Sequence, residues 1–271
     1  MRRKIYDPLN RRLFYLEHKA SEEFWDKKWE KTAESTFASP PRHGLTIRIT
    51  RRYLPSGSRV LEGGCGLGDF VYALHRAGYI VDGIDYAPGV VQAINAHWPM
   101  LRVTQGDVRN LPFGDGVYDG YWSIGVIEHF PEGYDTIALE MQRVLRPGGY
   151  LFLSFPSFNP FRQSLAAQGK YTLLSECSEI MSNFYQYALN PVDVKEHFER
   201  LGFEQVEDRG TSSLQGLAED SRLADYIMRF FDRFPPRMGI GVSMMMDLVI
   251  GRYAGHSCLL ILRKNDSWAV S

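Results

Sequence analysis

Apolar side chains follow different spacings on either side of residue 58. Before it, the run 17–31 has helical spacing and places Phe24, Trp25 and Trp29 on one face, and a second helix is predicted over about 45–53. The Pro-Ser-Gly sequence at 55–57 ends this region. Beyond it, short apolar runs alternate with amphipathic segments, which predicts alternating strands and helices.

The alternation covers five predicted strands. They are expected at 59–62, 79–85, 101–105, 118–124 and 150–155, with helices at 68–77, 88–97 and 136–145. This pattern predicts an α/β fold with a doubly wound parallel sheet and helices on both faces. Such sheets bind ligands beyond the carboxyl ends of their strands, where the strand order reverses. We therefore expect the loops after residues 62, 85, 105 and 124 to share one edge.

The alternation of strand and helix signals weakens after residue 155. Residues 156–190 hold many aromatic side chains but few regular signals, and a loop of that length usually is functional or has structure of its own. A helix over 191–201, a strand over 203–209, two helices within 217–252 and a last strand over 258–263 follow. The predicted organisation is an N-terminal helical cap at 1–57, a core at 58–156, a cap or lid at 157–190, and a C-terminal part of the core at 191–271 with a helical insertion at 217–252.

Cysteine usage and apolar stretches bear on the compartment. Three scattered cysteines form neither a disulfide framework nor a metal-ligand spacing, and no apolar run follows the basic start as in a secretory signal, so a cytoplasmic protein is expected. The stretch 238–250 contains Asp247 and is too short to span a bilayer. We interpret it as a buried helix; the alternatives are a helix that lies against a membrane surface and one that lines a lipid-like pocket.

Charge bears on the partners. The net charge of −1 does not call for a nucleic acid. Residues 1–52 hold 13 Lys and Arg against 7 Asp and Glu, which either attracts an anionic substrate or only forms the solvated faces of surface helices.

A glycine loop follows the first strand of the alternation. Glycines at this point allow a sharp turn and a close approach of the backbone to a ligand. In either register, the dinucleotide spacing G-x-G-x-x-G/A would place its third position on Asp69 or Val71 instead of glycine or alanine. An acid followed by three alternating glycines fits instead, and it suits a ligand with an ammonium and a sulfonium, which S-adenosylmethionine (SAM) carries. The residues of this run are Glu62, Gly64, Cys65, Gly66 and Gly68, with Cys65 read as a small buried thiol.

Two more acids end the next strands. Asp85 is placed to accept hydrogen bonds from ribose hydroxyls, and Asp107 from an adenine amino group, with the Val108 amide facing a ring nitrogen. Tyr86 and Ile124 follow the strand ends and complete the expected cofactor-binding set, and no metal site is expected.

Five motifs in this order resemble the class I SAM-dependent methyltransferase family. They are Glu-Gly-Gly-Cys-Gly-Leu-Gly, Gly-Ile-Asp-Tyr-Ala, Gly-Asp-Val-Arg-Asn-Leu-Pro-Phe, Tyr-Asp-Gly-Tyr-Trp-Ser-Ile-Gly-Val-Ile-Glu-His-Phe and Val-Leu-Arg-Pro-Gly-Gly-Tyr, within 58–156. The branch that the chain resembles is the ubiquinone/menaquinone-type small-molecule methyltransferases. The resemblance implies a Rossmann-like sheet of seven strands with the last one antiparallel, and SAM as cofactor.

The fourth strand is expected to line the methyl-transfer site. Ser123 is placed near the methionine part of SAM, and His129 is the candidate catalytic base. The alternative for His129 is a pocket-shaping role, since the resembled family carries a Glu-His pair in members with unlike acceptors. The Asn/Asp-Pro-Pro-aromatic motif of enzymes that methylate adenine, cytosine or glutamine nitrogens is absent.

The sequence therefore predicts a methyltransferase acting on an O, N or C atom of a small molecule, such as a natural product, a quinone or phenol, or a saccharide or lipid intermediate. Its acceptor site is expected between the N-terminal helices and residues 156–190. Alternatives are a non-catalytic or regulatory SAM-binding protein and a nicotinamide oxidoreductase. Nucleic acid and integral membrane association are not expected, and a homodimer stays open.

Overall fold

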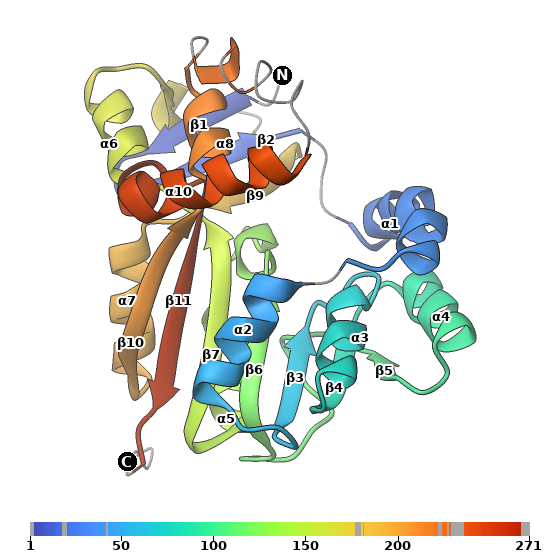
Figure 1. The fold of residues 1–271 in the computed structure, drawn as a ribbon. Coiled ribbons are helices and arrows are strands. Elements are labelled where there is room, and N and C mark those ends of the chain that lie inside the picture. Colours follow the sequence, from blue (N-terminus) through green and yellow to red (C-terminus); the bar gives the residue numbers. More distant parts are fainter. Residues whose placement is uncertain are drawn as a thin grey trace. The chain divides into compact units, whose positions relative to one another are not determined.

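The computed structural model of the chain describes residues 3–17, 21–41, 43–176, 180, 182–221, 224–226, 228 and 236–266 (Figure 1). The chain divides into two compact units. The first unit comprises Met1–Lys19, Ser154–His197 and Glu207–Leu260. The second unit comprises Ala20–Leu153, Phe198–Val206 and Ile261–Ser271.

A seven-stranded sheet has the order β10-β11-β7-β6-β3-β4-β5. Its strands, in the order of the chain, are β3 (Arg59–Gly63), β4 (Ile80–Asp85), β5 (Arg102–Gln105), β6 (Tyr118–Ile124), β7 (Leu145–Pro156), β10 (Phe203–Thr211) and β11 (Ser257–Lys264). β3 pairs in parallel with both β4 and β6, and β4 pairs in parallel with β5. The strand order therefore reverses between β3 and β6, the position where such sheets bind ligands. The final strands are antiparallel, as the family resemblance implied.

The helices of the second unit begin and end at residues suited to those positions. α3 (Asp69–Arg76) starts after Gly68, whose φ is +68°, and stops before Gly78, whose φ is +91°. α4 (Pro88–His97) begins with proline, which needs no amide partner in the first turn. The second unit also contains the helices α2 (Gly44–Tyr53) and α5 (Asp135–Val144). α2 and α3 lie on the same face of the sheet (Figure 1).

The core of the second unit is built on aromatic side chains. Trp122 of β6 is 1% exposed, stacks on Phe152 at 4.5 Å between ring centroids and meets Phe70 of α3 edge-on at 5.2 Å. Its indole N–H donates to Thr50 Oγ1 of α2 at 3.1 Å, so the buried polar atom is satisfied. These contacts fix both helices against the strands that carry the site.

The first unit contains a second sheet with the order β8-β1-β2-β9. Its strands are β1 (Arg3–Asp7), β2 (Arg12–Leu16), β8 (Thr172–Leu173) and β9 (Phe184–Ala188). The helices α6 (Pro160–Ala167), α8 (Ser213–Ala218) and α10 (Pro236–Ala254) belong to this unit, and α7 (Pro191–Arg200) begins in it. The first unit also contains the short 3₁₀ helix η2 (Leu174–Glu176), whereas the 3₁₀ helix η1 (Ile127–His129) lies in the second unit.

The expected helical cap over residues 1–57 needs correction. Residues 3–16 form the antiparallel pair β1–β2, and helix follows only in α1 (Glu22–Ala38) and α2. α1 begins at its N-cap Ser21, whose side chain accepts from the Phe24 amide, and not at residue 17. The segment 157–190, expected as a cap or lid, has structure of its own in α6, β8 and β9.

Two further boundaries differ from the sequence prediction. β7 starts at Leu145, so Pro147 and Gly148 lie within the strand instead of separating a helix from it. Of the two helices expected within 217–252, α8 ends at Ala218 and α10 begins at Pro236, and most of 222–235 lies outside the described residues. Within the described part of the chain, no helix is long and apolar enough to cross a membrane.

Candidate active site

The glycine loop between β3 and α3 adopts a conformation that other residues rarely take. Gly64, Gly66 and Gly68 have φ values of +73°, +50° and +68°. The loop is also crowded, because a methyl group at Gly64 would lie 2.5 Å from Cγ2 of Val126. Glycine is therefore required here for both conformation and space.

Asp85 ties this loop to the end of β4. Its carboxylate accepts hydrogen bonds from the Gly66 amide at 2.8 Å and the Ala87 amide at 3.1 Å. Burial raises the pKa of Asp85, and these backbone donors oppose the rise. Each carboxylate oxygen has a further lone pair with which to accept from a ligand hydroxyl.

Strand register brings the predicted residues to one edge. Gly63 pairs with Ser123 of β6 and with Ile84 of β4, and Asp85 pairs with Gln105 of β5. Because the paired strands are parallel, the residues that follow them meet at their carboxyl ends. This edge holds the predicted set, whose members are Glu62, Gly64, Cys65, Gly66, Gly68, Asp85, Tyr86, Asp107, Val108, Ser123 and Ile124.

Unsatisfied polar atoms gather at the same edge. Glu62 is 4% exposed, and its Oε2 has no hydrogen-bond partner among the described residues; the same is true of Ser123 Oγ and Glu128 Oε2. Burial, followed by the charges of Asp69 and Asp85, raises the pKa of Glu62 well above its usual range. Native proteins leave few buried polar atoms unpaired. The grouping of these unpartnered oxygens at one edge indicates a ligand that brings hydrogen-bond donors or positive charge.

Asp107 has a different environment from the other acids. It forms an ion pair with Arg109 at 2.7 Å and accepts the Arg109 amide at 2.8 Å. Partial burial would raise the pKa of Asp107, but these hydrogen bonds outweigh it and lower the pKa. Val108 beside it is buried, whereas Tyr86 is 36% and Ile124 40% exposed, so the latter two present open apolar surface at the strand ends.

Helix α1 contributes side chains that the sequence analysis did not assign to this edge. A methyl group at Gly66 would lie 2.9 Å from Cζ2 of Trp29, so the indole rests on the glycine loop. Asp26 Oδ1 is buried without a partner in the described chain, and a methyl group at Gly89 would lie 3.0 Å from it. α1 also packs along α4 (Figure 1). Between the two helices Phe37 stacks on His97 at 4.7 Å between ring centroids. The only indication in the sequence of the contact between α1 and this edge was the aromatic face of the run 17–31.

η1 carries the candidate base. The half-buried His129 ring meets the edge of Trp25 at 4.9 Å between centroids, and Trp25 stacks on Trp29 at 5.7 Å. The neighbouring Glu128 is 2% exposed, and burial raises the pKa of its carboxyl to about 8. His129 is thus joined through two indole rings to the loop at Gly66, while Glu128 points into the interior.

Comparison with known proteins agrees with this geometry. Residues 61–153 match the family model described as a methyltransferase domain. A probable SAM-dependent methyltransferase from Mycolicibacterium smegmatis is 31% identical over 164 residues, which cover 60% of this chain and 59% of that protein. A demethylmenaquinone methyltransferase from Staphylococcus carnosus is 27% identical over 222 residues, 74% of this chain and 81% of that protein.

Solved structures share the fold at low identity. A putative methyltransferase in complex with the Trm112 activator of Haloferax volcanii has a TM-score of 0.57 at 18% identity, covering 89% of this chain and 97% of that one. A Burkholderia thailandensis 1,6-didemethyltoxoflavin-N1-methyltransferase, solved with its acceptor and S-adenosylhomocysteine, has a TM-score of 0.53 at 16% identity, covering 97% and 100%. Residues 61–153 therefore match the methyltransferase domain of the class I SAM-dependent family, in which SAM is the methyl donor.

Proposed function

We propose that the protein transfers the methyl group of SAM to an O, N or C atom of a small-molecule acceptor. The observation that carries this proposal is the buried, unpartnered carboxylate oxygen of Glu62 beside the glycine loop at the switch point of the sheet. An acid in this position disfavours a pyrophosphate and favours a cationic ligand. This supports SAM over a nicotinamide dinucleotide.

The residues present fit SAM part by part. Glu62 would accept from the ammonium group, Asp85 from the ribose hydroxyls, and Asp107 with the Val108 amide would meet the adenine ring. Ser123, at the end of β6, would face the methionine part. SAM supplies an activated methyl group on a positively charged sulfur, so the protein has mainly to align the acceptor and exclude water, which is worth about 7–11 kcal/mol of the barrier when alignment is good.

In this proposal Trp25 and Trp29 of α1 exclude water from the methyl-transfer site. Their stacked rings cover the loop at Gly66 and contact His129, which limits the solvent around the end of β6. We propose that the acceptor approaches along this aromatic wall, where His129 either removes a proton or shapes the pocket. The described cysteines, Cys65 and Cys258, are free and buried, which supports the cytoplasm as the compartment.

The test separates donor binding from catalysis. Isothermal titration with S-adenosylhomocysteine should give saturable binding, and NADH should give none. Incubation with SAM and fractionated small metabolites should then produce a compound heavier by one methyl group, detected by mass spectrometry. Absence of S-adenosylhomocysteine binding would contradict the donor site, and binding without any methylated product would favour a non-catalytic SAM-binding protein.

A further inference from the structure

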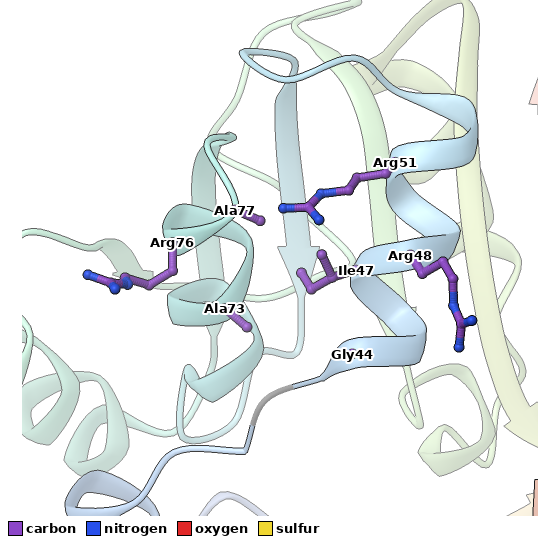
Figure 2. Close-up of a pocket in the computed structure, with 7 residues that line it drawn as sticks. All are labelled: Gly44, Ile47, Arg48, Arg51, Ala73, Arg76 and Ala77. Atoms are coloured by element: carbon purple, nitrogen blue, oxygen red, sulfur yellow. The ribbon is translucent and has the colours of Figure 1, made fainter.

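A hollow of about 420 Å³ lies between α2 and α3, away from the glycine loop (Figure 2). α2 lines it with Ile47, Arg48 and Arg51, and α3 with Ala73, Arg76 and the C-cap residue Ala77. The α3 residues belong to the C-terminal half of that helix, whereas the glycine loop precedes its first residue. The hollow is therefore separate from the proposed donor site, and its volume lies in the range of small-molecule sites.

The arginines of this groove differ from the other arginines of the described chain. Most of the others form an ion pair with a carboxylate: Arg11, Arg12, Arg59, Arg102, Arg109, Arg143, Arg146, Arg162, Arg209, Arg252 and Arg263. Arg48, Arg51 and Arg76 are exposed, and none has a carboxylate partner among the described residues. Acids neutralise most of the other arginines of the described chain, whereas the three arginines of this groove have no acidic partner within it.

The absence of acidic residues from α2 and from the lining of the groove strengthens the positive potential of the groove. α2 carries Arg48, Arg51 and Arg52 and has no acidic residue, and no acid lines the hollow from α3 either. Figure 2 shows Arg51 reaching across the groove from α2 toward Ala77, whereas Arg48 and Arg76 extend from its two outer sides. Because no ion pair holds these two side chains outward, their long stems can turn toward an anion held by Arg51.

We infer that this groove binds a small phosphate-bearing ligand. Guanidinium groups match phosphate oxygens with paired, charge-assisted hydrogen bonds, and three of them suit a group with more than one negative charge. The side chains of Ile47, Ala73 and Ala77 between the arginines give an apolar floor for the organic part of the ligand. Arg51 is the anchor, and Arg48 and Arg76 close on the ligand from either side.

Isothermal titration with inorganic pyrophosphate tests the site. Wild-type protein should bind with sub-millimolar affinity that falls as salt is raised. Arg51→Gln should weaken binding by about tenfold or more, and Arg48→Gln and Arg76→Gln by about three- to tenfold each, because each removes one charged donor. Arg51→Lys should fall between wild type and Arg51→Gln, since it keeps the charge but loses the fork of donors.

Arg252→Gln is the matched control, because it removes an exposed charge on α10 outside the groove. It should leave pyrophosphate affinity within about twofold, because Arg252 does not line the groove and exposed charges are screened by salt. Unchanged S-adenosylhomocysteine binding in Arg51→Gln would show an intact fold. The inference is overturned if wild-type protein binds no pyrophosphate, or if Arg252→Gln loses as much as Arg51→Gln. Arg51-dependent binding to phosphatidylglycerol vesicles without pyrophosphate binding would also overturn it, in favour of a lipid surface.

Discussion

The indole of Trp29 lies on Gly66, with a methyl group at that glycine falling 2.9 Å from Cζ2 of the ring. Gly66 in turn donates its amide to Asp85 at 2.8 Å. A side chain from α1 and a carboxylate from β4 therefore hold the same loop residue from different elements. The donor loop and α1 position each other, and a change in either is expected to affect both.

Gly66→Ala is expected to weaken both the fold and donor binding. The positive φ alone costs a non-glycine residue about 1–2 kcal/mol, and the added methyl group displaces Trp29. We expect S-adenosylhomocysteine affinity, measured by isothermal titration, to fall by more than about tenfold, and the free energy of unfolding in urea to drop by more than the strain alone.

Gly169→Ala separates strain from contact in that experiment. Gly169 has a φ of +68° but nothing within 4 Å of an added methyl group. It should lose stability through strain alone and bind S-adenosylhomocysteine normally. Equal donor affinity in Gly66→Ala and wild type would show that the loop lies outside the donor site.

Trp29→Ala is expected to reduce donor affinity although it leaves the sequence of the loop unchanged. Loss of the indole opens the loop at Gly66 to water, so we expect S-adenosylhomocysteine to bind about five- to tenfold more weakly. Glu30→Gln on the exposed side of α1 is the control and should bind as wild type does. If both variants match wild type, α1 serves only the acceptor side, as the sequence alone suggested.

Glu128 predicts a stability that falls as pH rises. The folded protein holds a proton on this carboxyl up to about pH 8, whereas the unfolded chain releases it near the usual Glu value. The wild type therefore loses stability between those two pH values, at up to about 1.4 kcal/mol per pH unit. Glu128→Gln carries no such penalty, so its advantage in urea denaturation should grow from pH 5 to pH 8 and then level off. A constant difference across that range would contradict a buried carboxyl with a raised pKa.

The residues at the sheet edge can be predicted from sequence, because each strand and the loop that follows it are encoded by neighbouring residues. Glu62 and Asp85 end apolar runs that a parallel sheet must align, so their meeting at one edge requires only the strand–helix alternation. The contact of Trp29 with Gly66 needs the docking of α1 on α4, which no periodicity encodes. The aromatic face was visible in the sequence, but its partner was not.

The β1–β2 pair was missed for a related reason. In β2 the residues Leu13 to Leu16 are all buried, so the strand lacks the alternation by which half-buried strands are recognised. Its partner β9 begins at Phe184, far along the chain. The segment is a strand through its short-range pairing with β1 and its long-range pairing with β9, whereas the neighbouring run 17–31 favoured the helical interpretation.

Glu219 predicts an acid-sensitive cluster in the first unit. Burial opposes ionisation of Glu219, but the hydrogen bond from His256 and the charges of Arg162 and Lys4 outweigh it and lower its pKa to about 2. Since the folded pKa is depressed, the stabilisation is complete above the usual Glu value and is lost as pH falls toward 2. Glu219→Gln should lose about 3 kcal/mol at pH 7 and progressively less below pH 4.5, measured by urea denaturation.

Glu204→Gln provides the comparison for that loss. Glu204 forms an exposed ion pair with Arg263, and such pairs contribute little, about 0–1 kcal/mol. The difference between the two variants at pH 7 should therefore vanish near pH 2. A loss in Glu219→Gln that does not change with pH would assign the effect to packing around Arg162 instead of to its charge.

Once an acceptor has been identified, His129→Ala distinguishes a general base from a residue that only shapes the pocket. A general base contributes about 10²- to 10⁴-fold to turnover, so loss of a base should lower kcat by that factor and remove its dependence on pH. S-adenosylhomocysteine affinity should stay near wild type in either case, because His129 contacts Trp25, whereas Trp29 is the indole that lies on Gly66. His75→Ala, on the exposed side of α3, controls for loss of an imidazole. Near wild-type kcat with a raised acceptor KM would reject the base and leave His129 as the residue that holds Trp25 against the acceptor.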